Sequence, residues 1–294
     1  MLILRWLAFT LGALVLCALG FVGWVYAASE AHFRSFSAPS AFTHPIPENE
    51  ASIAHGARLA LTRGCYGCHG AALQGEVMWG NVQTPNLPAL ARTEPPAAFE
   101  SAIRHGIGHD GRALYSMPSY NFVRMSDQDV AALIAFLRAT PVSNEAPPGD
   151  LAPWFERTRG DFMIRLEIAK GADGAMPRFL NLGPPLSQQD NPDQRIARGE
   201  YLAMTSCNEC HGMSLRADYP WPSNAPDLIV MSAYNQDAFT RLMREGVPSS
   251  GAELPMMGPV ARGRFVHWTD EEIADLYAYL TDMSRRAVEA ESPD

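Results

Sequence analysis

The chain has 294 residues, of which 47% are hydrophobic and 19% are charged, and its formal net charge is -9. This length predicts about two domains of ordinary size, and the composition supplies enough apolar side chains for buried cores. The acidic balance argues against a nucleic-acid-binding protein, which needs a concentrated basic surface to follow phosphates.

The N-terminal segment is strongly apolar. Residues 6–29 read WLAFTLGALVLCALGFVGWVYAAS and carry no charged side chain between Arg5 and Glu30. About 20 apolar residues cross a bilayer core as a helix, whereas a cleaved signal peptide has an apolar stretch of about 7 to 15. We therefore favour an uncleaved transmembrane anchor, with a signal peptide as the alternative. Arg5 favours a cytoplasmic N-terminus, which would place the rest of the chain outside the cytoplasm.

Four of the five cysteines form two pairs with the same spacing. The sequence GCYGCHG contains Cys65, Cys68 and His69, and SCNECHG contains Cys207, Cys210 and His211. Outside the cytoplasm, four cysteines would ordinarily form two disulfides, but that interpretation leaves the histidine after each pair unexplained. Cys17 lies in the apolar run, where we expect it to pack as a small hydrophobic residue.

The two motifs belong to a longer internal repeat. The segment AHGARLALTRGCYGCHG aligns with ARGEYLAMTSCNECHG, which has one residue fewer before its motif. Further along, TPNL aligns with APDL, AFESAIRHGI with AFTRLMREGV, and MSDQDVAALIAFL with WTDEEIADLYAYL. The chain is therefore duplicated, and each half carries one motif at the same place.

Each half of the repeat is predicted to be helical. Its last segment places apolar side chains at i, i+3, i+4 and i+7, the spacing of one face of an α-helix. These positions are Val130, Leu133, Ile134 and Leu137 in the first copy and Ile273, Leu276, Tyr277 and Leu280 in the second. Both final helices begin with a capping-box pattern, Ser126 with Asp129 and Thr269 with Glu272.

The predicted architecture is all-α, with two domains in tandem. A first helix runs from about Gly56 or Gly199 toward each motif, and a middle helix lies near residues 97–105 or 237–245. The predicted segments are an anchor at 1–29, a tether at 30–50, a first domain at 51–142, a linker at 143–192, a second domain at 193–286 and a tail at 287–294. The linker is rich in proline and glycine, but we expect its more apolar centre to pack on the domains.

The Cys-x-x-Cys-His spacing predicts a covalently attached haem. Residues three and four apart share one face of a helical turn, so Cys65, Cys68 and His69 can address one flat ligand. The two thiols can add across the two vinyl groups of haem, and the imidazole is then placed as an axial iron ligand. The alternative is a zinc site, but no further cysteine repeats between the halves to complete its ligands.

An electron-transfer haem also needs a ligand on the opposite face of the iron, and methionine is the ligand that raises the reduction potential. The first half offers Met117 in the loop LYSMPSYNF, whereas Met125 lies beside a helix cap and is expected in the core. The second half offers Met256 and Met257, of which we favour Met257. The remaining histidines near the motifs do not repeat and are expected at the surface or behind the ligands; they are His55, His105, His109 and His267.

These features resemble class I c-type cytochromes fused in tandem. The resemblance is carried by two copies of a glycine-containing first helix, C-x-x-C-H-G, a loop methionine and a final L-x-A-Y/F-L helix. The phrases ARGEYLA and MPSYNFVRMSDQDVAALIAFL are further similar to the multihaem subunits of membrane-bound bacterial alcohol and aldehyde dehydrogenases, which usually carry one haem more. The resemblance implies attachment of haem in the periplasm, and that Gly56 and Gly199 lie where the first helix crosses the last, near Phe136 and Tyr279.

The sequence therefore predicts a periplasmic dihaem cytochrome c held in the inner membrane by one helix. It would carry electrons between a dehydrogenase or quinol-side donor and a respiratory acceptor such as a terminal oxidase, without being an enzyme. Two haem c groups would be attached through Cys65, Cys68, Cys207 and Cys210, with His69, Met117, His211 and Met257 as axial ligands. The alternative is a dihaem enzyme of the cytochrome c peroxidase kind, and a methionine in both loops argues against its open iron site.

Overall fold

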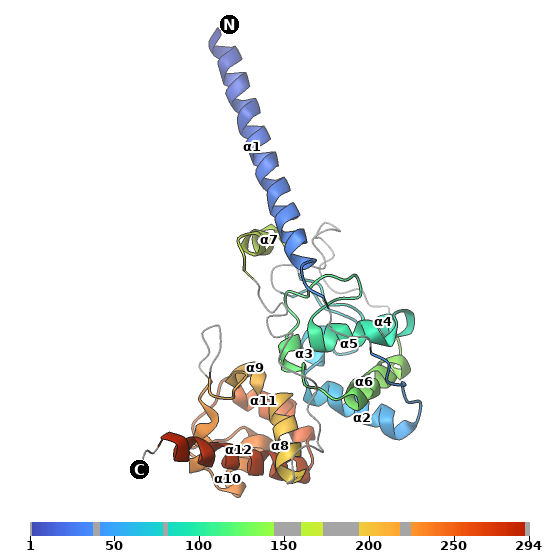
Figure 1. Ribbon diagram of the computed structural model, residues 1–294, viewed down its shortest axis with the longest axis vertical. Coiled ribbons are helices and arrows are strands. Elements are labelled where there is room, and N and C mark those ends of the chain that lie inside the picture. The colour runs from blue at the N-terminus through green and yellow to red at the C-terminus, as the bar shows by residue number, and fades with distance from the viewer. Residues whose placement is uncertain are drawn as a thin grey trace.

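The computed structural model describes residues 2–37, 42–78, 82–143, 160–172, 194–217 and 225–291. These residues form helices and two isolated β-bridges, with no strand among them. A long N-terminal helix, α1 (Leu2–Phe33), projects from two helical domains, and the first domain lies nearer to it than the second (Figure 1). The predicted all-α architecture is confirmed.

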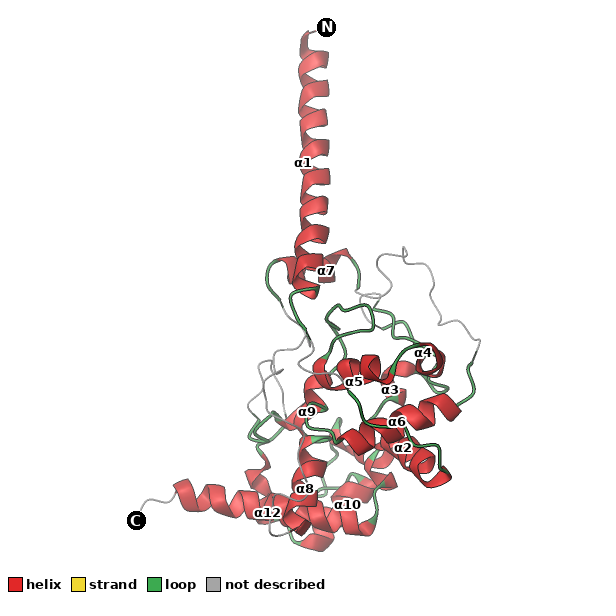
Figure 2. Cartoon of the chain, turned by 45° about the vertical axis from the view of Figure 1, so that its right-hand side comes forward, coloured by secondary structure: helices red, strands yellow, loops and turns green. Residues whose placement is uncertain are grey.

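The two domains share a first helix, a motif turn, a middle helix and a last helix in the same order (Figure 2). The first contains α2 (Glu50–Thr62), α3 (Tyr66–His69), α4 (Leu87–Thr93), α5 (Pro96–His105), a 3-10 turn η2 (Ser119–Asn121) and α6 (Asp127–Ala139). The second contains α8 (Gln194–Met204), α9 (Asn208–His211), a 3-10 turn η3 (Leu228–Ala233), α10 (Gln236–Glu245), α11 (Met257–Gly263), a 3-10 turn η4 (Phe265–His267) and α12 (Asp270–Glu291). The short helices α3 and α9 carry the two motifs.

Each domain is built on a close crossing of its first and last helices. A Cβ atom placed on Gly56 of α2 would lie 2.0 Å from the carbonyl oxygen of Ala132 in α6. A Cβ on Gly199 of α8 would likewise lie 2.1 Å from the carbonyl oxygen of Asp275 in α12. The next residues contacted are Phe136 and Tyr279, respectively, through their Cβ atoms, so the predicted crossings are confirmed.

Two separate hydrophobic cores lie behind these crossings. The predicted apolar faces of the last helices are buried, with Tyr277 the one member that is partly exposed. Large side chains from the rest of each domain complete the cores, and they include Leu59, Leu73 and Phe99 in the first domain and Leu202, Phe239 and Trp268 in the second. Each such side chain stabilises its domain by about 1.5–3 kcal/mol on burial.

The last helices of the two domains differ at their N-terminal caps. In α12, Thr269 Oγ1 accepts a hydrogen bond from the Glu272 amide (3.1 Å), and Glu272 Oε2 accepts one from the Thr269 amide (2.8 Å). In α6, Ser126 Oγ accepts from the Asp129 amide (3.1 Å), but the Asp129 carboxylate bonds to side chains at the domain boundary instead. The capping box predicted for α12 is confirmed, and the one predicted for α6 is only half formed.

The N-terminal helix extends beyond its predicted end because its C-terminal part, residues 26–33, is packed. This part is called the foot of α1. α7 (Phe162–Ala169), from the centre of the predicted linker, lies against the foot of α1 (Figure 1). There Arg165 is buried and donates a hydrogen bond to Ser29 Oγ (3.1 Å). Ile164 and Ile168 share an apolar cluster with Phe33 and with side chains of the first domain. The helix therefore continues through residues that were expected to form a tether.

The C-terminal helix also exceeds its prediction. α12 continues to Glu291, into the segment expected as a tail. Arg285 pairs with Glu289 one turn later (2.8 Å), and such pairs support an exposed helix.

The glycine crossings predict a matched set of substitutions. Gly56→Ala or Gly199→Ala should lower the free energy of unfolding by about 1–3 kcal/mol, because the new methyl group meets backbone and not a flexible side chain. Gly263→Ala is the control: nothing lies within 4 Å of its Cβ position, so the better helix propensity of alanine should prevail. Thermal unfolding followed by circular dichroism measures both, and an equal effect at all three positions would contradict the crossing argument.

Candidate functional site

Each motif occupies one helical turn directly after the first helix of its domain. Cys65 is the N-terminal cap of α3, and the His69 amide bonds to the Cys65 carbonyl oxygen (3.0 Å). Cys207 caps α9 in the same way, and the His211 amide bonds to its carbonyl oxygen (2.9 Å). All five cysteines are free thiols, so the disulfide interpretation finds no support.

A proline carbonyl orients each motif histidine. His69 Nδ1 lies 3.1 Å from the carbonyl oxygen of Pro85, and His211 Nδ1 lies 2.9 Å from that of Pro226. Since a carbonyl oxygen can only accept, Nδ1 must carry the proton, which leaves Nε2 as the ligating nitrogen. Burial lowers the pKa of both histidines, against the opposing effect of these hydrogen bonds, and this favours the neutral imidazole.

The sequence analysis missed the two prolines, although the signal was visible. Pro85 lies in TPNL, 16 residues after His69, and Pro226 lies in the repeated segment APDL, 15 residues after His211. This repeat lies outside the predicted helices and away from the cysteines, and its side chains do not indicate a ligand or a catalytic group. Its role lies in a backbone carbonyl, which side-chain reasoning does not examine.

A large apolar cavity opens beside the first motif. It has a volume of about 1060 Å³, and Cys65, Cys68 and His69 line it together with Met117 from the loop before α6. Apolar side chains make up much of the remaining wall, among them Leu87, Leu90, Phe99, Ile103, Leu133 and Leu137. Two thiols, an imidazole and a thioether facing one apolar space are the donor set of a haem c site, so these residues fit that cofactor.

The neighbouring methionine Met125 has the core position that was expected of it. Its side chain is fully buried in the first domain's hydrophobic cluster, and it also contributes to the cavity wall. Met117 is partly exposed and packs against the edge of the same cluster. This contrast agrees with the preference for Met117.

The second domain offers two neighbouring methionines near its motif. Met257 begins α11 and packs against the same core cluster that Cys207 contacts. The preceding Met256 is the cap residue of α11, and its side chain is 75% exposed. The side chain of Met257 is thus the one turned toward the domain interior.

The remaining candidate histidines have other partners. His55 Nε2 lies 2.7 Å from Asp129 Oδ1, and the buried His105 lies 2.9 Å from Glu100 Oε1. His109 lines the rim of the cavity, and His267 is exposed. In the described ranges, no three side chains of His, Cys, Asp or Glu gather as a metal-ion site, so the zinc alternative finds no ligand set there.

Burial also affects the motif thiols. It raises the pKa of Cys65 to about 11 and the pKa of Cys207 to about 12, so both are protonated at neutral pH. Arginine side chains oppose this shift, Arg264 at Cys65 and Arg63 at Cys207.

The two domains meet through reciprocal contacts at the N-termini of α6 and α12. Tyr201 of α8 donates its hydroxyl to Asp129 Oδ2 of α6 (2.5 Å), and Arg58 of α2 donates to Glu272 of α12 (2.7 Å). In the repeat, Arg58 corresponds to Tyr201 and Asp129 to Glu272. Each domain therefore offers the same helix position to the other's cap, as in a two-fold interface.

Comparison with known proteins agrees with this geometry. The family model for cytochrome c matches residues 53–141 and, again, residues 196–284. The chain belongs to the cytochrome c family. It contains two cytochrome c domains in tandem, and such domains imply covalently bound haem c.

Several curated proteins resemble the chain along most of its length. It is 26% identical to the cytochrome c subunit of alcohol dehydrogenase (quinone) from Gluconobacter oxydans (strain 621H), over 82% of the chain and 56% of that protein. It is 25% identical to the fructose dehydrogenase cytochrome subunit of Gluconobacter japonicus, over 83% and 56%. A diheme cytochrome c-type protein of Cereibacter sphaeroides is 31% identical over 45% of the chain and 43% of that protein. The chain thus spans just over half the length of the first two relatives.

The contacts of Asp129 with His55 and Tyr201 at the domain boundary predict a substitution effect that depends on pH. Burial raises the pKa of Asp129, but the hydrogen bonds from His55 and Tyr201 and the nearby Arg63 charge bring it below its ordinary value. The stability from the Asp129 carboxylate is therefore complete above about pH 4 and is lost as the pH falls through the lowered pKa. Tyr201→Phe should cost about 1–3 kcal/mol at neutral pH, and this difference from the native chain should shrink below pH 4.

Tyr277→Phe is the control for this substitution. Its hydroxyl donates to the Tyr234 carbonyl oxygen (2.9 Å) inside the second domain, which is a neutral acceptor and not a carboxylate. Denaturant unfolding over a range of pH measures both variants. If their pH dependence is the same, Asp129 does not couple the domains as described.

Proposed function

We propose that the chain is a periplasmic dihaem cytochrome c, anchored in the inner membrane, that carries electrons between a dehydrogenase or quinol-side donor and a respiratory acceptor. The observation that carries this proposal is the repeated site, in which a turn with two thiols is followed by a histidine whose Nδ1 is held by a proline carbonyl. Haem bound in such a site supplies a reversible one-electron iron couple.

The chain's own residues hold and tune each site. Cys65 and Cys68, or Cys207 and Cys210, would form the thioether bonds, and each motif histidine would ligate through Nε2. Met117 and Met257 would supply the opposite axial ligand. The apolar wall of the first cavity excludes water and so supports a high reduction potential.

The relatives support a dehydrogenase as the partner. Two of them are named as cytochrome subunits of alcohol and fructose dehydrogenases, and a third is named as a diheme protein. Their names describe electron-transfer subunits, which agrees with a carrier that has no catalytic residue of its own. We propose a terminal oxidase or a similar respiratory enzyme on the acceptor side.

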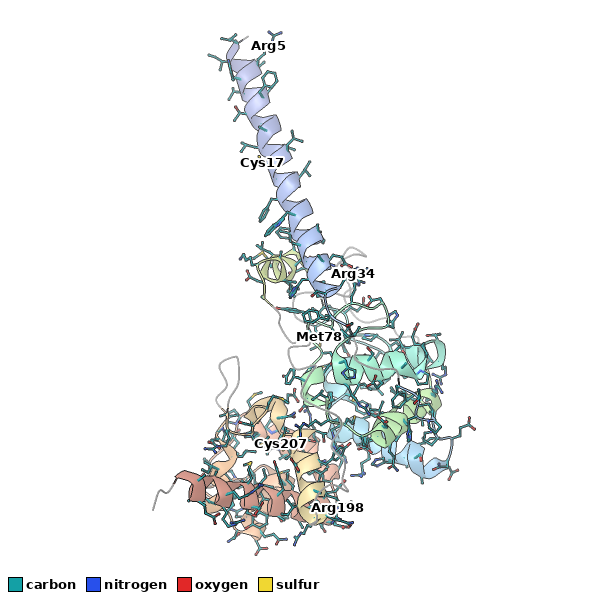
Figure 3. All side chains as sticks on the ribbon, viewed as in Figure 1. Arg5, Cys17, Arg34, Met78, Arg198 and Cys207 are labelled. Carbon is teal, nitrogen blue, oxygen red and sulfur yellow. The ribbon has the colours of Figure 1, made fainter. Side chains whose placement is uncertain are left out.

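The foot of α1 supports a membrane anchor over a cleaved signal. Among the described residues α1 is the helix whose length and apolar composition suffice to cross a membrane, a test that a signal sequence also passes. Its foot is built into the structure, because Arg165 of α7 lies over the rings of Tyr26 and Phe33, 4.9 and 5.6 Å from their centroids. Figure 3 shows Arg5 near the free end of α1 and Arg34 at this foot. Cleavage near residue 29 would remove part of this cluster.

The haem content and the axial ligands test the function directly. The purified chain should keep its haem on a denaturing gel and contain two haems per chain. Met117→Ala and Met257→Ala should each remove about half of the weak red absorption band of methionine-ligated ferric haem, since each variant loses one of two sulfur ligands. Met256→Ala, the neighbouring and exposed control, should leave the band unchanged. Haem that leaves the chain on denaturation would contradict the proposal.

The packed anchor predicts a local effect of Arg165. The full chain should stay in membranes after alkaline extraction. In that chain, Arg165→Gln should speed amide hydrogen exchange in α7 by about tenfold or more, because it removes a buried charged hydrogen bond of about 1.5–3 kcal/mol. Lys170→Gln is the control, since Lys170 pairs only at the surface with Glu167 (2.8 Å). Release of the native chain by alkali would contradict the anchor. Equal exchange rates in both variants would show that Arg165 does not hold α7 against α1.

A further inference from the structure

One ion pair lies where the two motif turns meet across the domain boundary. Arg264, the C-terminal cap of α11, packs over Gly64 beside the first motif: a Cβ placed on Gly64 would lie 2.2 Å from the guanidinium carbon. Arg264 also donates to Glu209 Oε2 (3.1 Å), and Glu209 lies between Cys207 and Cys210 in the second motif. The pair therefore touches both motifs at once.

Both charges of this pair lie close to both sites. Arg264 and Glu209 belong to the second domain, yet both line the cavity of the first. Glu209 also lies within the second motif, next to Cys210. One cation and one anion thus lie beside the attachment turns of both domains.

The repeat shows that this contact follows from the reciprocal interface. Arg264 corresponds in the first half to Asn121, and Asn208 in the second motif lies near that residue, with its amide nitrogen 3.5 Å from the Asn121 carbonyl oxygen. The same position of each domain therefore faces the motif of the other. It carries a charge only in the second domain, and Glu209, which takes the place of Gly67, supplies the counter-charge.

We infer that the Arg264–Glu209 pair is an electrostatic bridge between the two haem sites, which holds their attachment turns together and contributes to the reduction potential of both. This inference rests on the proposed dihaem function. Reduction adds an electron to a site, so a nearby cation favours the reduced state and a nearby anion opposes it. Because the pair is partly buried between the domains, solvent screens these effects less than it would at an open surface.

Potentiometric titration of the full, detergent-solubilised chain tests the bridge. Absorbance of the reduced haems should resolve two one-electron steps. Arg264→Gln should move both steps to lower potential, Glu209→Gln should move both to higher potential, and the double variant should return close to the native values because the charge changes cancel. Arg285→Gln is the control, since Arg285 pairs with Asp282 and Glu289 near the end of α12 and should shift neither step.

Three results would overturn the inference. A shift of only one step would assign the pair to one site. Unchanged potentials with a lower unfolding temperature would make it a purely structural contact. If the native chain carries fewer than two haems, both the proposed function and the bridge are wrong. If it carries two haems whose potentials do not change in the variants, only the bridge is wrong. If Arg264→Gln loses haem, two other variants test the inference. Arg264→Lys, which keeps the charge, must leave both potentials unchanged, and Glu209→Gln must still raise both potentials.

Discussion

The close approach of two helix backbones is the contact on which the rest of each domain depends. Since Gly56 and Gly199 have no side chain, α2 and α8 lie directly on the carbonyl groups of α6 and α12. That contact positions the first helix against the last, and the motif turn begins after the end of the first helix. A side chain at either position would force the helices apart and move the thiols and the histidine relative to the methionine loop, which precedes the last helix of the pair.

The same crossings bring the two domains together. The N-termini of α6 and α12 are left at the edge of each crossing, and carboxylates in their first turns accept bonds from the first helix of the other domain, Tyr201 to Asp129 and Arg58 to Glu272. The first helices lead directly into the motif turns. A contact between caps and first helices therefore also places one motif opposite the other, with Arg264 over Gly64.

Much of this arrangement could be predicted from one chain, because the duplication supplies its own comparison. The repeat identified the motifs and the final helices, since each depends on side chains at fixed spacing, whereas the glycine crossings were implied by the resemblance to class I c-type cytochromes. It could not show the half-formed cap at Asp129, which follows the same local pattern as Glu272 but is directed to another domain. It also missed α7, whose buried arginine is explained only by the foot of α1. Contacts between segments far apart in sequence decide both cases.

The differences between the copies carry information that their shared residues do not. Residues that agree, such as the motif cysteines, the histidines and Pro85 with Pro226, build a site inside one domain. Three positions disagree: Arg58 with Tyr201, Asn121 with Arg264 and Gly67 with Glu209. Each has a member at the domain boundary, since Arg58, Tyr201 and Asn121 bond across it, and Arg264 and Glu209 pair with each other and line the first domain's cavity. A reciprocal interface turns the same position of each domain toward the other domain, so a charge shared by both copies would stand twice at one boundary. At the Asn121/Arg264 and Gly67/Glu209 positions only the second domain carries a charge, and its cation and anion pair with each other there.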